Sequence, residues 1–247
     1  LLDSIIPSSQ MEQSMSQPNH KLYYWPVPFR GCFVSYQFAY RNVPLLHESS
    51  YEKISGLMLL DPSEQHIPFM GPPVLEILDA NQHISQMPAI VLYTARELNL
   101  LPDNHFDAAM CLKVLMDCND LLMEICRYNG SMMWDRQDWI EFRSRRLPRW
   151  MKIFEESLAR GAIGADAMTF ADISVYALFG NMTRCLPELE SDLHGMAPGI
   201  QSLCDRIGST PSLERFVAEQ ESEYGDLYCG GQIESSIREM LALDGAR

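Results

Sequence analysis

The chain has 247 residues, room for one large domain or two small ones, and its 47% hydrophobic and 21% charged residues are typical of a globular protein. Its 33 acidic and 19 basic residues give a net charge of -14, which argues against a nucleic-acid partner. No apolar run reaches the ~20 residues of a membrane-spanning helix, so we expect no membrane partner.

Seven cysteines are scattered along the chain without a Cys-x-x-Cys pair. Their number is odd and their spacing suggests neither a zinc site nor a dithiol motif, so we expect no metal. Reduced thiols, buried as small apolar side chains, indicate a cytoplasmic protein.

The two ends of the chain have their own composition. Residues 1–20 are rich in Ser, Gln and Pro and lack the basic start and apolar stretch of a secretory signal. We interpret them as a flexible tail or as the remnant of a leader or expression tag, with Met11 or Met15 as a possible start. Residues 225–247 are expected to be a C-terminal tail, in which Ile233, Ile237 and Met240 have the spacing of a short helix.

Strand and helix patterns alternate between residues 21 and 100. We expect four strands, at 21–25, 43–47, 74–78 and 82–85. We expect two helices, at 30–40 and from Pro88 to about 98. Residues 50–71 contain Pro62, Pro68 and Gly71 and are expected to be irregular. This order predicts a small α/β domain over 21–100.

From Asp103 on, the sequence indicates helices only, which predicts an all-α domain over 103–224 after a short linker. A first long helix carries an apolar stripe, made of Cys111, Leu115, Cys118, Leu122 and Ile125. A second is expected around 139–158, interrupted at Pro148. Thr169 and Asp172 have the spacing of a capping box that opens a buried helix, and Pro211 opens another helix.

Four stretches together resemble the cytosolic glutathione transferase family. They are KLYYWPVPFRGC at 21–32, PPVL at 72–75, ISQMPAI at 84–90 and TFADI at 169–173. They occur in the family's order and at fitting spacing, over about residues 21–220. The resemblance implies a thioredoxin-like N-terminal domain, an all-α C-terminal domain and a homodimer.

Transferases of this family stabilise the thiolate of glutathione with a hydrogen-bond donor and let it attack an electrophile. Tyrosine-type members place a Tyr at the end of the first strand, followed by an aromatic residue and Pro-x-Arg-Gly. Tyr24 matches this position, in a loop two residues longer, and is the expected catalytic residue. On a second register, Pro28 resembles the loop of cysteine- and serine-type members. The catalytic position would then be Val27, which has no chemistry, and Cys32 lies too far along the helix.

The resemblance assigns glutathione binding to six further residues, Arg30, Pro72, Pro73, Val74, Gln86 and Met87. Arg30 would help to hold the carboxylate of the peptide, and Gln86 would contact the γ-glutamyl group. Pro73 is expected to be cis, which would expose the backbone of Pro72 to the backbone of glutathione.

Two of these residues depart from the family pattern. Pro72 has no N–H to donate to the peptide. Met87 stands where the family has a Ser whose hydroxyl holds the γ-glutamyl carboxylate. Losing two hydrogen bonds costs about 2–4 kcal/mol of glutathione binding free energy, unless the N-terminus of the following helix compensates.

Two functions fit these residues. The first is a glutathione transferase, with glutathione as co-substrate, that acts on a small apolar electrophile in detoxification. The alternative is a non-catalytic ligand-binding or interaction protein of the same fold with a weakened glutathione site. No Gly-x-Ser-x-Gly, His-Glu-x-x-His or phosphate-binding loop supports a hydrolase or nucleotide enzyme. The electrophile stays open, because its pocket would be built from variable residues after Tyr24 and from the first and last helices of the all-α domain.

Overall fold

The computed structural model describes residues 17–245, so the expectations for residues 1–16 lie outside it. The N-terminal region is a mixed sheet with three helices. Its strands are β1 (His20–Tyr23), β2 (Leu46–Glu48), β3 (Val74–Ile77) and β4 (Gln82–Ser85). Its helices are α1 (Cys32–Tyr40), α2 (Tyr51–Leu59) and α3 (Met87–Glu97).

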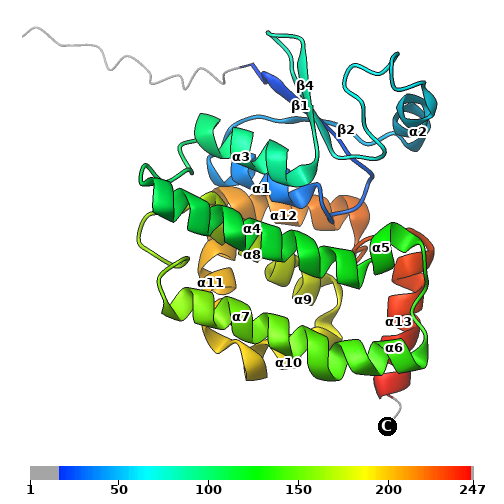
Figure 1. Ribbon diagram of the computed structural model, residues 1–247, viewed down its shortest axis with the longest axis vertical. Coiled ribbons are helices and arrows are strands. Elements are labelled where there is room, and N and C mark those ends of the chain that lie inside the picture. Colours follow the sequence, from blue (N-terminus) through cyan, green and yellow to red (C-terminus); the bar gives the residue numbers. More distant parts are fainter. Residues whose placement is uncertain (1–16, 246–247) are drawn as a thin grey trace, which may run out of the picture.

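The sheet has the strand order β2-β1-β3-β4. β1 and β2 are parallel, whereas β3 runs antiparallel to both β1 and β4. Helices α1 and α3 pack together below the sheet (Figure 1), where the buried Gln37 of α1 donates to Thr94 Oγ1 of α3 at 2.9 Å. This is the expected thioredoxin-like arrangement, with the β3–β4 hairpin as predicted.

The prediction of irregular structure over residues 50–71 is wrong, because α2 occupies its first part. Ser50 caps this helix by accepting the N–H of Lys53 at 3.3 Å. Only Ile54 of α2 is buried, so the helix carries too little apolar periodicity to be recognised in the sequence.

Every regular element described beyond residue 100 is helical, as expected. The α-helices are α4 (His105–Ile125), α6 (Arg136–Glu141), α7 (Leu147–Ala159), α8 (Phe170–Val175), α9 (Asn181–Cys185), α10 (Glu190–Met196), α11 (Pro198–Gly208), α12 (Pro211–Tyr224) and α13 (Gly231–Gly245). The element α5 (Arg127–Gly130) is a left-handed turn after α4. Two π-helical turns, Phe142–Arg146 and Tyr176–Gly180, and a 3-10 turn, Pro187–Leu189, join some of them.

Several local predictions for this region are confirmed. The stripe of α4 is buried, and the interruption of the second long helix is a π-helical turn that ends just before Pro148. The Thr169 hydroxyl accepts the N–H of Asp172, whose carboxylate accepts the N–H of Thr169 at 2.8 Å. Helix α8 is buried at every residue. α10 and α11 have no counterpart in the predicted elements.

The C-terminal helix α13 is longer than the short helix expected within residues 225–247. It stands along one side of the helical region beside α6 (Figure 1), where the Asp244 carboxylate accepts hydrogen bonds from Trp139 Nε1 at 2.9 Å and Arg143 Nη1 at 2.8 Å. None of the helices in residues 17–245 combines the length and hydropathy needed to cross a bilayer.

Candidate functional site

Tyr24 follows β1 directly and extends its pairing with β2 by donating its N–H to Glu48 O at 3.1 Å. Its side chain is 7% exposed. The ring lies so close to Gly31 that a Cβ at this glycine would be 2.5 Å from Tyr24 Cδ1. Glycine is therefore required at position 31 by the close approach of the ring.

The Tyr24 hydroxyl accepts the backbone N–H of Arg30 at 2.9 Å. Its own proton has no acceptor among residues 17–245, so it is available to a ligand. Burial raises the pKa of Tyr24, and the charge and backbone N–H of Arg30 oppose this effect without reversing it. The hydroxyl is thus protonated at neutral pH and is a hydrogen-bond donor.

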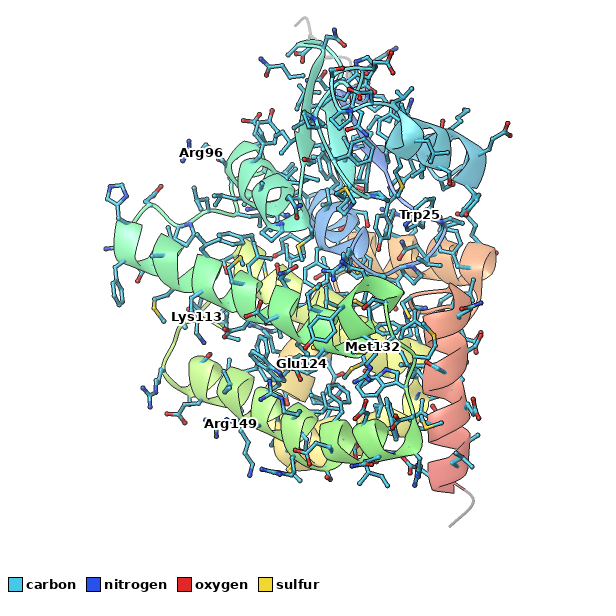
Figure 2. The ribbon with its side chains drawn as sticks, turned by 45° about the vertical axis from the view of Figure 1, so that its right-hand side comes forward. Trp25, Arg96, Lys113, Glu124, Met132 and Arg149 are labelled. Carbon is cyan, nitrogen blue, oxygen red and sulfur yellow. The ribbon has the colours of Figure 1, made fainter. Side chains whose placement is uncertain are left out.

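The loop between Tyr24 and α1 is held by hydrogen bonds from the N-terminal α/β region and from the helical region. Cys32 donates its thiol proton to Phe29 O at 2.8 Å, and Asn181 of α9 donates its side-chain amide to Pro28 O. In the same loop, the ring of Trp25 (Figure 2) packs against the ring of Tyr51 at the start of α2, with 5.4 Å between the ring centroids.

A cleft of about 730 Å³ opens beside Tyr24. It is lined by residues after β1, by α2 and the segment that follows it, by the start of α3, by the end of α4 with α5, and by residues around the start of α13. The cleft brings together six of the seven expected site residues, Tyr24, Arg30, Pro72, Pro73, Gln86 and Met87.

Val74 is the expected site residue whose side chain does not line this cleft. It is buried in β3 and faces a smaller apolar pocket near Ile54 of α2. The preceding Pro72–Pro73 peptide bond is cis, as expected. Both prolines line the cleft, and Pro72 offers only its carbonyl oxygen to a ligand.

The start of α3 forms another part of the cleft wall. Gln86, the N-cap, has φ 73° and makes no capping hydrogen bond through its side chain. Met87 is 2% exposed and adds an apolar thioether instead of a hydroxyl. The first N–H groups of a helix have no partner within it, so this end of α3 can still bind a carboxylate through backbone groups and the helix dipole.

The C-terminal wall is held by a buried carboxylate. Glu234 Oε2 accepts the N–H groups of Tyr228, Cys229 and Gly230 at 2.9, 3.0 and 2.6 Å. This fixes Cys229 at the cleft.

Within the described residues, no group of three or more His, Cys, Asp and Glu side chains could hold a metal ion.

A family model of the C-terminal domain of glutathione S-transferases matches residues 110–240. The chain belongs to the glutathione S-transferase family. A comparison with curated protein sequences finds no match.

Several solved structures share the fold at low sequence identity. The Pi-class glutathione S-transferase of Onchocerca volvulus has a TM-score of 0.71 at 17% identity, over 86% of this chain and 98% of that chain. Prostaglandin synthase D of Nilaparvata lugens has a TM-score of 0.67 at 19% identity, over 82% and 99%. Rat hPGDS complexed with a quinoline has a TM-score of 0.67 at 21% identity, over 82% and 97%.

The helical wall supplies cleft residues that the transferase motifs did not indicate. They are Asn119, Met123, Cys126 and Asn129. The only signal for them in the sequence was the expectation that the first helix of the all-α region contributes to the second-substrate pocket. Met58 and Met70 also line the cleft, and they fall in the segment that was expected to be irregular.

Proposed function

We propose that the protein is a glutathione transferase in which Tyr24 stabilises the thiolate of glutathione for attack on a small apolar electrophile. The observation that carries this proposal is the Tyr24 hydroxyl at the cleft wall. It accepts the Arg30 N–H at 2.9 Å and keeps a proton for a ligand. A hydrogen bond donated to sulfur favours the anion and so increases the fraction of reactive thiolate.

Five of the expected residues, Pro72, Pro73, Val74, Gln86 and Met87, would hold the peptide. The N-terminus of α3 at Gln86 and Met87 would bind the γ-glutamyl carboxylate through backbone N–H groups. The Pro72 carbonyl would accept the N–H of the cysteinyl residue, with Pro73 and the backbone of Val74 beside it. The thiol would lose its proton to solvent, and the sulfur would bond to the electrophilic carbon while a leaving group departs with its bonding electron pair, or while the π electrons of an unsaturated carbonyl pass to its oxygen.

Isothermal titration with reduced glutathione tests the site directly. We expect saturable binding with a dissociation constant between micromolar and low millimolar. Conjugation of glutathione to neutral aromatic electrophiles, measured by absorbance, tests the activity. Binding without turnover of any electrophile rejects the enzyme, and no binding at several millimolar glutathione rejects the site as well.

The alternative is a binding protein of the same fold that has lost catalysis. Two observations favour it: Pro72 offers no N–H, and Met87 brings a buried thioether to the position of the family's hydroxyl. This function predicts no glutathione binding but retained binding of apolar ligands, which a fluorescent apolar probe in the same titration detects.

We further propose a cytoplasmic homodimer that acts in detoxification, with domains at residues 21–100 and 103–224. The family pattern supports these statements. Light scattering of the purified protein checks the assembly, and a mass equal to one chain contradicts the dimer.

A further inference from the structure

Among the described residues that line the cleft, Arg30 is the only Asp, Glu, Lys or Arg. Most of the remaining surface is apolar, including Trp25, Phe29, Met123 and Ile233. Its polar side chains other than Tyr24 and the thiols are the uncharged amides of Gln86, Asn119 and Asn129. In a chain with a net charge of -14, the cleft thus combines apolar walls with a single positive charge.

Within the part of the chain that the structure describes, the guanidinium of Arg30 contacts neutral groups only. Nη1 donates to Asn119 Oδ1 at 3.1 Å, and Nη2 donates to Asn129 Oδ1 at 3.2 Å and to Met123 Sδ at 3.1 Å. The same nitrogen lies 3.6 Å from Cys126 Sγ. In residues 17–245, no carboxylate pairs with Arg30, and neither Nε–H nor the second Nη1 hydrogen has an acceptor. A half-buried cation with free donors and no counter-charge favours an anionic ligand.

The acceptors of Arg30 belong to α4 and α5, whereas the proposed peptide-binding residues lie around the start of β3 and at the start of α3. Asn119 and Met123 are on α4, and Asn129 is on the α5 turn. The guanidinium is therefore turned toward the end of α4, and only its backbone N–H is used by Tyr24. Its charge therefore faces helices that lie outside the expected peptide-binding motifs.

Asn129 is held by unusual backbone geometry. The four residues from Arg127 to Gly130 all have positive φ, between 48° and 76°. Non-glycine residues rarely adopt this region in succession, and such strain gathers at functional sites. The Asn129 N–H donates to Cys126 Sγ at 3.3 Å, which fixes the turn against the end of α4. The turn thus positions an acceptor that orients Arg30.

We propose that Arg30 binds a carboxylate of the second substrate, so that the cleft selects electrophiles with an apolar body and one anionic group. This inference rests on the proposed transferase function and names its substrate class. Asn119 and Asn129 act as positioning residues. For an α,β-unsaturated ketone, the thiolate bonds to the β-carbon and the π electrons pass to the carbonyl oxygen. Solvent then protonates the α-carbon, and the distant carboxylate is unchanged.

A matched pair of electrophiles tests the proposal. Ethacrynic acid carries an α,β-unsaturated ketone and a remote carboxylate, and its methyl ester has the same ketone without the charge. Rates are corrected for the uncatalysed reaction of each. For the wild type, we expect kcat/KM to be about 10–100-fold higher for the acid, the value of a charge-assisted hydrogen bond.

Substitutions at Arg30 identify the source of the preference. Arg30→Gln is expected to lower the ratio of kcat/KM for the acid to that for the ester to near one. Arg30→Lys is expected to keep part of the preference. Arg149→Gln is the matched control, because Arg149 is an exposed cation on α7 outside the cleft (Figure 2). It should leave the ratio unchanged.

The outcomes separate this inference from the function on which it rests. Equal rates for acid and ester in the wild type overturn it without requiring any variant. A ratio that Arg30→Gln leaves unchanged, with a raised KM for glutathione, also overturns it and assigns Arg30 to the peptide. If the wild type conjugates neither compound, the aromatic electrophiles decide the transferase function, and titration with the acid and ester alone decides the inference. Tighter binding of the acid that depends on Arg30 supports it, and equal binding overturns it.

Discussion

Tyr24→Phe removes one oxygen from the cleft and leaves the ring in place. Two effects follow from the contacts of that oxygen. The Arg30 N–H, which reaches it at 2.9 Å, loses its acceptor in a partly buried position. An unsatisfied donor of this kind costs about 1–3 kcal/mol, so we expect the free energy of unfolding to fall by that amount.

The second effect concerns the thiolate. A hydrogen bond to a charged group is worth about 1.5–3 kcal/mol. At 1.36 kcal/mol per unit, its loss raises the pKa of the bound glutathione thiol by about 1–2 units. Below both pKa values, the thiolate fraction and kcat/KM then fall about 10–100-fold. When the pH rises above the pKa of bound glutathione in both the wild type and Tyr24→Phe, the thiol is fully ionised in both proteins. The difference in thiolate fraction then disappears.

The assay is the pH dependence of kcat/KM between pH 6 and 10, at saturating glutathione, for wild type and Tyr24→Phe. Tyr23→Phe is the control, because the Tyr23 hydroxyl donates to Glu76 at 2.7 Å and does not line the cleft. Its rate should equal that of the wild type. A Tyr24→Phe rate that is unchanged at pH 6.5, or reduced by the same factor at every pH, refutes the role of the hydroxyl in thiolate stabilisation.

Three further predictions concern the site and the stability of the fold. Gly31→Ala places a Cβ 2.5 Å from the Tyr24 ring, so we expect a loss of about 1–3 kcal/mol in unfolding free energy together with reduced turnover. Gly56→Ala on the exposed helix α2 meets no atom within 4 Å and should stabilise by about 0.5–1 kcal/mol, and equal effects of the two substitutions would contradict this reasoning. Met87→Ser restores a hydroxyl and is expected to tighten glutathione binding about 10–100-fold, as measured by calorimetry. It should also lower the melting temperature, because the thioether that it removes is 2% exposed. An unchanged affinity for glutathione would contradict the placement of Met87 at the peptide site. Partial burial raises the pKa of the Asp244 carboxyl. Hydrogen bonds from three side chains outweigh this effect and lower the pKa to about 2. Its stabilisation of the folded state is therefore full above about pH 4 and lost as the pH falls through about 2. The difference in the free energy of unfolding between wild type and Asp244→Asn, measured with urea, should shrink over that pH range. A constant difference would contradict the lowered pKa.

The predictable part of the fold has short-range causes. The β3–β4 hairpin follows from alternating side chains around the Asp79-Ala80-Asn81 turn, and the start of α8 follows from the Thr169 capping box. Helix α2 was missed because its only buried residue is Ile54. A helix that buries so little leaves no apolar period in the sequence, and its existence depends on the sheet beside it.

The candidate site divides in the same way. Tyr24, Pro73 and Gln86 were found because they occupy fixed positions in short motifs at the ends of strands and helices. Asn119 and Asn129 were not found, because an amide on a helix surface has no sequence pattern that shows what it faces. Their relation to Arg30 spans 89 and 99 positions along the chain.

The sequence alone therefore determined the family resemblance, the α/β region followed by helices, and the tyrosine that we propose for thiolate stabilisation, since each is recognised from short motifs or from local periodicity. Tertiary structure decided what surrounds that tyrosine. Packing of α4 and the left-handed turn at 127–130 against the loop after β1 turned Arg30 toward the end of α4 and left its charge without a carboxylate partner among residues 17–245. Charge compensation depends on every group within a few ångströms, whatever its position in the chain, so only the folded protein shows it.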